Sequence, residues 1–258
     1  MATQPLTRPL LVGNWKMQGL SSQLADIQAL ADALRTRPTQ AEVLICPPAT
    51  LIERAARAAD SVFAIGGQTC HHAPNGAFTG ELSAEMLRDA GATAVIVGHS
   101  ERRQQQGETD AIVAAQARAA LRAGLLPLIC VGETLAQHAA GQSMAVCGEQ
   151  LAHSVPQDVA GAALVIAYEP LWAIGSGHLP SADEITAMHA HLRQCLLARL
   201  GLAGAAVRIL YGGSVTPGNA RALLALPEVA GALVGAASLR VADFEAIVRS
   251  TDQRKHPA

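Results

Sequence analysis

The strongest constraint on the fold is an alternation, along most of the chain, between short apolar runs and stretches with helical periodicity. The runs are almost wholly apolar, which is typical of strands buried on both faces, as in parallel sheets. They lie at residues 10–12, 43–46, 62–65, 94–97, 126–131, 164–168, 207–211 and 232–234. The mean repeat is about 30 residues, the length of one strand–helix unit.

Helix signals separate the runs. Ser21 and Ser22 are expected to cap one helix, and Thr109 precedes another. Ser181 and Glu184 are spaced as a capping box that opens a helix over residues 185–200. The residues expected at helical spacing are Leu24, Ile27, Ala31, Leu34, Ile112, Ala115, Ala119, Arg122, Phe244, Ile247 and Val248.

About eight strands and about eight helices in strict alternation predict an α/β fold. We expect a single-domain (β/α)8 barrel, a closed parallel sheet with outer helices, over residues 1–258 with its core at about 10–250. The two ends carry no motif, and we expect them to be loose. A doubly wound open sheet is the alternative, but no strand is followed by the glycine pattern of dinucleotide-binding sheets.

The composition narrows the function classes. A formal net charge of −2 gives no electrostatic case for nucleic acid or an anionic membrane. No apolar run approaches the roughly 18 residues of a membrane span, and the first residues do not read as a signal peptide. Five cysteines, an odd number without a C-x-x-C pair, favour a reducing cytoplasm over disulfides or zinc.

Cys70, His71 and His72 are the nearest approach to a metal cluster. Consecutive side chains diverge, and no carboxylate follows them at ligand spacing. We therefore predict no metal at this point and interpret the segment as a loop in contact with another surface.

If the chain is a barrel, its chemistry lies at the carboxyl ends of the strands. Lys16 follows the first strand in Gly-Asn-Trp-Lys. Of 19 lysines and arginines only Lys16 and Lys255 are lysine, so a lysine at a strand end stands out. An ammonium is a compact charge suited to a phosphate or a developing oxyanion, which predicts a functional Lys16.

His99 and Glu169 follow the fourth and sixth strands. Histidine is suited to passing protons near neutral pH. A glutamate that ends a buried strand is costly unless it is paired or working. Glu101 and Arg102 are either functional or a structural ion pair, and for Arg103 we favour the ion pair.

The segment after Glu169 is longer than a plain connection needs, with an apolar body and two glycines at its end. We expect a lid that closes over the site and expels water. Its residues are Pro170, Leu171, Trp172, Ala173, Ile174, Gly175, Ser176 and Gly177.

Small residues follow the seventh and eighth strands, in Tyr-Gly-Gly-Ser-Val at 211–215 and Gly-Ala-Ala-Ser at 235–238. Such turns expose backbone N–H groups and predict a phosphate cradle. A base, a histidine, a cation, a cradle and a lid suffice for proton abstraction beside the carbonyl of a small phosphorylated substrate. The set requires no cofactor and no metal.

The chain resembles the triosephosphate isomerase family from about Leu10 to about Ser250. The motifs that carry the resemblance are Gly-Asn-Trp-Lys at 13–16, Gly-Ala-Phe-Thr-Gly-Glu at 76–81, Gly-His-Ser-Glu-Arg-Arg at 98–103, Cys-Val-Gly-Glu-Thr at 130–134, Ala-Tyr-Glu-Pro-Leu-Trp-Ala-Ile-Gly at 167–175 and Tyr-Gly-Gly-Ser-Val at 211–215.

The resemblance implies a TIM barrel that interconverts dihydroxyacetone phosphate and D-glyceraldehyde 3-phosphate through an enediolate. Glu169 would be the base, neutral His99 would polarise the carbonyl, and Lys16 would stabilise the enediolate. The residues implied to bind substrate are Asn14, Lys16, Gly175, Ser214, Gly235 and Ala236. The residues implied to support the site are Glu101, Ser100 and Cys130.

The resemblance also implies a homodimer formed by a protruding loop between residues 68 and 81. The loop residues are Gln68, Thr79, Gly80 and Glu81, with Thr79 reaching the partner's site near Asn14 and Lys16. The chain departs from the family pattern at Ser176, where threonine is usual, at Ala236, where a second glycine is common, and at Thr69, where asparagine is frequent.

Two other functions fit parts of the pattern. A Schiff-base aldolase needs a lysine on a central or late strand, but Lys16 follows the first strand and Lys255 lies in the tail. A non-catalytic scaffold on the same fold would not need an intact acid–base set. An isomerase explains both the lysine after the first strand and the intact acid–base set.

Overall fold

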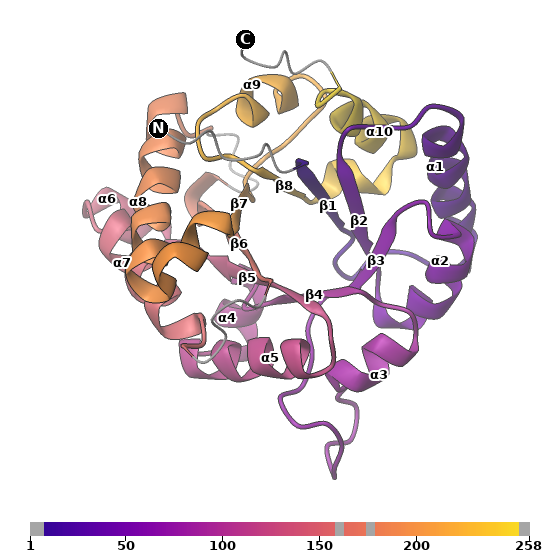
Figure 1. Ribbon diagram of the computed structural model, residues 1–258, viewed down its shortest axis with the longest axis horizontal. Coiled ribbons are helices and arrows are strands. Elements are labelled where there is room, and N and C mark those ends of the chain that lie inside the picture. The colour runs from indigo at the N-terminus through magenta and orange to yellow at the C-terminus, as the bar shows by residue number, and fades with distance from the viewer. Residues whose placement is uncertain (1–7, 158–162, 174–178, 253–258) are drawn as a thin grey trace.

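The computed structural model describes residues 8–157, 163–173 and 179–252, and in it eight strands form one closed parallel barrel. In the view of Figure 1 the strands make an inner ring and the helices an outer one. The strands are β1 (Leu10–Asn14), β2 (Glu42–Cys46), β3 (Ala64–Gly67), β4 (Ala94–Val97), β5 (Leu126–Val131), β6 (Val165–Tyr168), β7 (Arg208–Tyr211) and β8 (Gly231–Val234). Because β1 pairs with both β2 and β8, the ring closes and the predicted fold is confirmed.

The outer layer has more helices than the sequence predicts. They are α1 (Leu24–Thr36), α2 (Ile52–Ala59), α3 (Ala84–Asp89), α4 (Ser100–Gln106), α5 (Asp110–Arg122), α6 (Leu135–Ala139), α7 (Ser143–Ser154), α8 (Ala182–Leu200), α9 (Ala220–Leu224) and α10 (Val241–Arg249). The connections after β4 and β5 each hold two of them. Short 3-10 turns are η1 (Ser21–Gln23), η2 (Ala49–Leu51), η3 (Leu171–Ala173), η4 (Gly201–Ala206) and η5 (Ala236–Leu239). Among the described helices none is both long and apolar enough to cross a membrane.

Both faces of the strands are buried, which explains the unbroken apolar runs. In β4, Ala94 and Ile96 belong to the apolar cluster inside the barrel. Val95 and Val97 belong to the larger cluster between the barrel and the helices. Successive side chains point to opposite faces of a strand, so each run supplies both clusters at once.

The third strand lies two residues later than the sequence indicates. The run 62–65 predicts it, but β3 is Ala64–Gly67 and ends on two glycines. A Cβ at Gly66 would lie 2.9 Å from the Cys46 sulfur and 3.0 Å from the Ala94 carbonyl oxygen. Glycine is required there by the neighbouring strands, and strand propensity does not reveal such a requirement.

The predicted helix caps are partly confirmed. The Thr109 side chain accepts the Ile112 N–H, and Ser181 forms the capping box of α8. Ser21 and Ser22 do not cap α1; they form η1, and α1 begins at Leu24.

The predicted buried face is partly wrong for α5 and correct for α10. In α5 the expected face is wrong at its start, because Ile112 is 42% exposed and its neighbour Val113 is buried. In α10 the expected Phe244, Ile247 and Val248 are all buried.

Candidate active site

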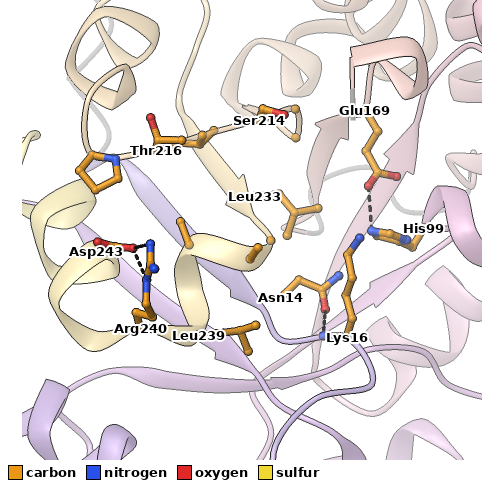
Figure 2. Close-up of a pocket in the computed structure, with 17 residues that line it drawn as sticks. Asn14, Lys16, His99, Glu169, Ser214, Thr216, Leu233, Leu239, Arg240 and Asp243 are labelled. Atoms are coloured by element: carbon orange, nitrogen blue, oxygen red, sulfur yellow. Dashed lines mark hydrogen bonds and ion pairs between the residues drawn. The ribbon is translucent and has the colours of Figure 1, made fainter. Parts of the chain in front are cut away.

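The polar signatures after β1, β4, β6, β7 and β8 line one cavity of about 710 Å³ at the carboxyl end of the barrel. The structure therefore brings together side chains that lie far apart in the sequence. The sequence-predicted residues on its wall are Asn14, Lys16, His99, Glu169, Ser214, Gly235 and Ala236. Figure 2 shows Lys16, His99 and Glu169 close together on one side of the cavity.

Glu169 lies directly after β6 and is 2% exposed. One carboxylate oxygen is 2.9 Å from His99 Nε2, and the other accepts the Ser100 N–H at 2.9 Å. Burial raises the pKa of Glu169, but His99, the Ser100 N–H and Lys16 together outweigh burial and hold the pKa below its ordinary value. Glu169 is thus a buried carboxylate that remains ionised near neutral pH.

Two glycines make room for Glu169. A Cβ at Gly132, which follows β5, would lie 1.9 Å from the Glu169 carbonyl oxygen. A Cβ at Gly212, which follows β7, would lie 3.0 Å from Glu169 Cγ. No local sequence pattern indicates this role for either glycine, because their neighbour Glu169 follows a different strand.

His99 is fixed by the turn from β4 into α4. Gly98 adopts φ 66°, a conformation that favours glycine, and His99 then caps α4. His99 Nδ1 accepts the Glu101 N–H at 3.3 Å, which leaves Nε2 to donate to Glu169. Burial lowers the pKa of His99, but the charge and hydrogen bond of Glu169 raise it more, so that the pKa is raised overall.

Lys16 is held at both ends. Its backbone has φ 55°, unusual for a residue with a side chain, and its N–H donates to Asn14 Oδ1 at 3.0 Å. Its Nζ lies 2.6 Å from Glu101 Oε1. Glu101 therefore contacts Lys16 through its carboxylate and His99 through its backbone.

The proposed phosphate side of the cavity lies after β7 and β8. The Ser214 hydroxyl donates to the Ala173 carbonyl oxygen at 3.2 Å, which joins this side to the base of the expected lid. Gly235 and Ala236 stand at the start of η5. Beyond them the cavity continues to Arg240 and Asp243, an ion pair that the sequence did not suggest as part of the site.

The first half of the expected lid, Pro170 to Ala173, is described, and it rests on Glu133. The Trp172 Nε1–H donates to Glu133 Oε1 at 2.8 Å, and the Leu171 N–H donates to the Glu133 carbonyl at 3.1 Å. Tyr168 also donates to this carboxylate, which is fully buried. The signal for Glu133 in the sequence is a glutamate just after a buried apolar run, although no role for Glu133 follows from it by itself. The lid residues Ile174, Gly175, Ser176 and Gly177 lie outside the described residues.

Cys130 and the expected dimer loop complete the predicted set. Cys130 lies inside the barrel, where burial and the nearby Glu169 carboxylate raise the pKa of its thiol. Thr79, Gly80 and Glu81 are exposed on the segment that protrudes between β3 and α3 in Figure 1. Gln68 is separate from them: it follows β3 and bonds to the backbone of Lys16 and Cys46.

Comparisons with known proteins agree with this geometry. Residues 9–251 match the family model described as triosephosphate isomerase. A triosephosphate isomerase of Hyphomonas neptunium is 53% identical over 249 residues, covering 96% of this chain and 100% of that protein. One of Rhodopseudomonas palustris is 54% identical over 244 residues, covering 93% and 96%. The crystal structure of triosephosphate isomerase from Bartonella henselae has a TM-score of 0.87 at 42% identity and covers 95% and 99% of the two chains. The chain therefore belongs to the triosephosphate isomerase family.

Proposed function

We propose that this chain interconverts dihydroxyacetone phosphate and D-glyceraldehyde 3-phosphate, with Glu169 as the base. One observation carries the assignment of roles. A buried, ionised carboxylate, a histidine and a lysine from three different strands face the same cavity. Membership in the family supports the reaction itself.

In the proposed reaction Glu169 removes a proton from carbon 1 of dihydroxyacetone phosphate. The electron pair of that C–H bond forms the carbon–carbon double bond of an enediolate, and the carbonyl oxygen at carbon 2 takes the negative charge. His99 Nε2–H donates to that oxygen and passes protons between the two oxygens. Glu169 then returns its proton to carbon 2, which gives the aldehyde.

For Glu169 to reach the substrate, its hydrogen bonds to two neighbouring groups must be replaced. Without substrate, its carboxylate oxygens are taken by His99 Nε2 and the Ser100 N–H. A substrate bound between Glu169 and His99 replaces their direct contact. The contribution of Glu169 to the raised pKa of His99 is then reduced, which favours the neutral imidazole that the reaction needs.

Lys16 and the turns after β7 and β8 serve the charged parts of the substrate. The Lys16 ammonium offsets the enediolate and the phosphate, and Asn14 lies beside it. Backbone N–H groups at Gly175, Ser214, Gly235 and Ala236 hold the phosphate. The lid, Pro170 to Gly177, excludes water, which strengthens each charge interaction and prevents loss of phosphate from the intermediate.

A coupled assay of triose phosphate interconversion without added metal tests the proposal. Lys16→Ala and Glu169→Gln should each lower kcat/KM at least about a hundredfold, the usual effect of removing one well-placed charge-stabilising group. Arg57→Ala and Glu53→Gln are matched controls, because these residues form an exposed ion pair on α2. Near-normal activity of either site variant would contradict the assigned role.

The protruding segment supports a homodimer as the second part of the proposal. His71 packs against Phe78 with ring centroids 4.1 Å apart, and the His71 N–H donates to the Leu82 carbonyl at 2.7 Å. The segment is thus ordered before binding, which lowers the entropic cost of association. Large apolar side chains are exposed on this segment at Phe78 and Leu82, on α3 at Met86, and on the loop after β1 at Met17 and Leu20. A second copy of the chain would cover them.

All five cysteines are free thiols, which supports a reducing compartment such as the cytoplasm.

A further inference from the structure

We propose that Gln68 is a positioning residue for the catalytic lysine, Lys16, rather than only a part of the dimer loop. The proposal rests on the proposed function, in which Lys16 stabilises the enediolate and the phosphate. Gln68 lies at the end of β3 and does not line the cavity, so it acts through the backbone of Lys16.

The amide of Gln68 joins the ends of three neighbouring strands. Its Nε2 donates to the Lys16 carbonyl oxygen at 2.8 Å and to the Cys46 carbonyl oxygen at 2.9 Å. The Cys46 carbonyl also accepts the Trp15 N–H at 3.1 Å. One side chain directly after β3 thereby connects the residues that follow β1 to the end of β2.

This fastening matters because Lys16 is in a strained conformation. Four non-glycine residues among those described have positive φ, and Lys16 at 55° is the member of the group that lines the cavity. Such a backbone persists only where surrounding contacts determine it. Asn14 Oδ1 binds the N–H of Lys16, and Gln68 binds its carbonyl.

The side chain direction follows from the backbone. With φ at 55°, Lys16 extends across the cavity mouth toward His99, and its Nζ lies 2.6 Å from Glu101 Oε1. If the Lys16 carbonyl lost its hydrogen bond from the Gln68 amide, the Lys16 backbone could relax to a negative φ. The ammonium would then leave its position beside the reacting oxygens, and small displacements of this kind reduce rates strongly.

The variant Gln68→Met tests the inference because methionine keeps the length of the side chain and removes both donors. We expect kcat/KM to fall about tenfold to a hundredfold, together with a similar loss of affinity for a phosphorylated carboxylate that mimics the enediolate. Gln28→Met is the matched control, because Gln28 is exposed on α1, its amide donates to Asp32 at 3.1 Å, and it does not line the cavity. Its kcat/KM should change by less than about threefold.

A double-mutant cycle with Lys16→Met decides whether Gln68 acts through the lysine. If it does, adding Gln68→Met to Lys16→Met causes no further loss of kcat/KM. A full additional loss in the double variant overturns the inference. A loss in Lys16→Met without any loss in Gln68→Met also overturns it but leaves the proposed function intact, whereas normal activity of Lys16→Met contradicts the proposed function.

Sedimentation at the assay concentration separates positioning from assembly. A Gln68→Met protein that keeps its oligomeric mass and still loses activity supports the inference. Activity that returns when the protein concentration is raised would mean that the variant had only lost its partner, and the inference would fail. In a crystal structure of the variant, Lys16 should no longer have φ near 55°.

Discussion

At the scale of single residues, the hydrogen-bond partners of a buried ionisable side chain decide whether it is charged near neutral pH. Glu169 and His189 are both almost fully buried. Glu169 has two donors and stays charged, whereas His189 Nε2 has no hydrogen-bond partner within the described part of the chain. Burial lowers the pKa of His189 to about 4, and the 3.3 Å contact of Nδ1 with the Glu228 carbonyl offsets this effect only in part.

The low pKa of His189 predicts acid sensitivity of the fold. The unfolded chain takes up a proton near pH 6.5, while the folded chain does so only near pH 4. The effect of His189 on the free energy of unfolding is therefore absent above about pH 6.5. The free energy of unfolding falls as the pH drops from there toward 4, with a loss of about 2 kcal/mol at pH 5. His189→Phe should remove this part of the pH dependence in urea unfolding at pH 7.5 and 5. His153→Phe, on the exposed side of α7, should keep it. Equal pH dependence in all three proteins would refute the prediction.

At the scale of elements, the connections after the strands are anchored by contacts to neighbouring strands. Glu133, which follows β5, accepts hydrogen bonds from Trp172 and Leu171 at the start of the expected lid, which follows β6. Its carboxylate accepts from Tyr168, Trp172 and the Cys147 thiol, and His138 of α6 stacks on Trp172 with ring centroids 4.0 Å apart. The lid base is thus built by the preceding strand–helix unit.

Loss of the Glu133 carboxylate should destabilise this anchor. Glu133→Leu would remove the acceptor of the buried Tyr168 hydroxyl and of the Trp172 Nε1–H, and we expect the free energy of unfolding to fall by about 2–4 kcal/mol. Glu133→Gln keeps one acceptor oxygen and should lose roughly half as much. Urea unfolding followed by circular dichroism measures both. The idea fails if Glu133→Leu is as stable as the parent.

The glycines of β3 give a second prediction for elements. Gly66→Ala would place a methyl group against Cys46 and Ala94 and should lower the free energy of unfolding by about 1–3 kcal/mol. Gly218→Ala is the control, because its nearest neighbour would be 3.9 Å away. It should change stability by less than about 0.5 kcal/mol. A stable Gly66→Ala would show that β2 and β4 can move apart.

At the scale of the whole molecule, barrel closure creates the site. The ends of β1, β4, β6, β7 and β8 meet at one mouth because all eight strands run parallel. The protruding segment between β3 and α3 is the part of the described chain that reaches away from this ring (Figure 1). In the proposed dimer this segment would contact the second copy.

The proposed dimer predicts a coupled loss of assembly and activity. Phe78→Asp would put a charge into the apolar contact and should halve the mass seen by sedimentation. It should also lower kcat/KM on the order of a hundredfold, because Thr79 of the partner would no longer support Lys16. Leu202→Asp is the control, since Leu202 is 92% exposed on η4, away from the segment. A dimeric Phe78→Asp would contradict this interface.

The sequence alone determined the fold and the chemistry-bearing residues. Apolar runs of one strand length, separated by helix signals, specify a parallel sheet because both faces of each strand are buried in it. Polar and glycine-rich residues directly after such runs, above all Lys16, His99 and Glu169, indicate a site because parallel strands end at the same edge.

Only the tertiary structure decided which groups touch. The glycine end of β3, the space that Gly132 and Gly212 leave for Glu169, the role of Glu133 and the hold of Gln68 on Lys16 all depend on neighbouring strands. Local patterns cannot encode them, because Gln68 and Lys16 are 52 positions apart along the chain and 2.8 Å apart in the barrel. Periodicity reports the burial of each segment, whereas hydrogen bonds and close contacts between segments exist only once the ring has closed.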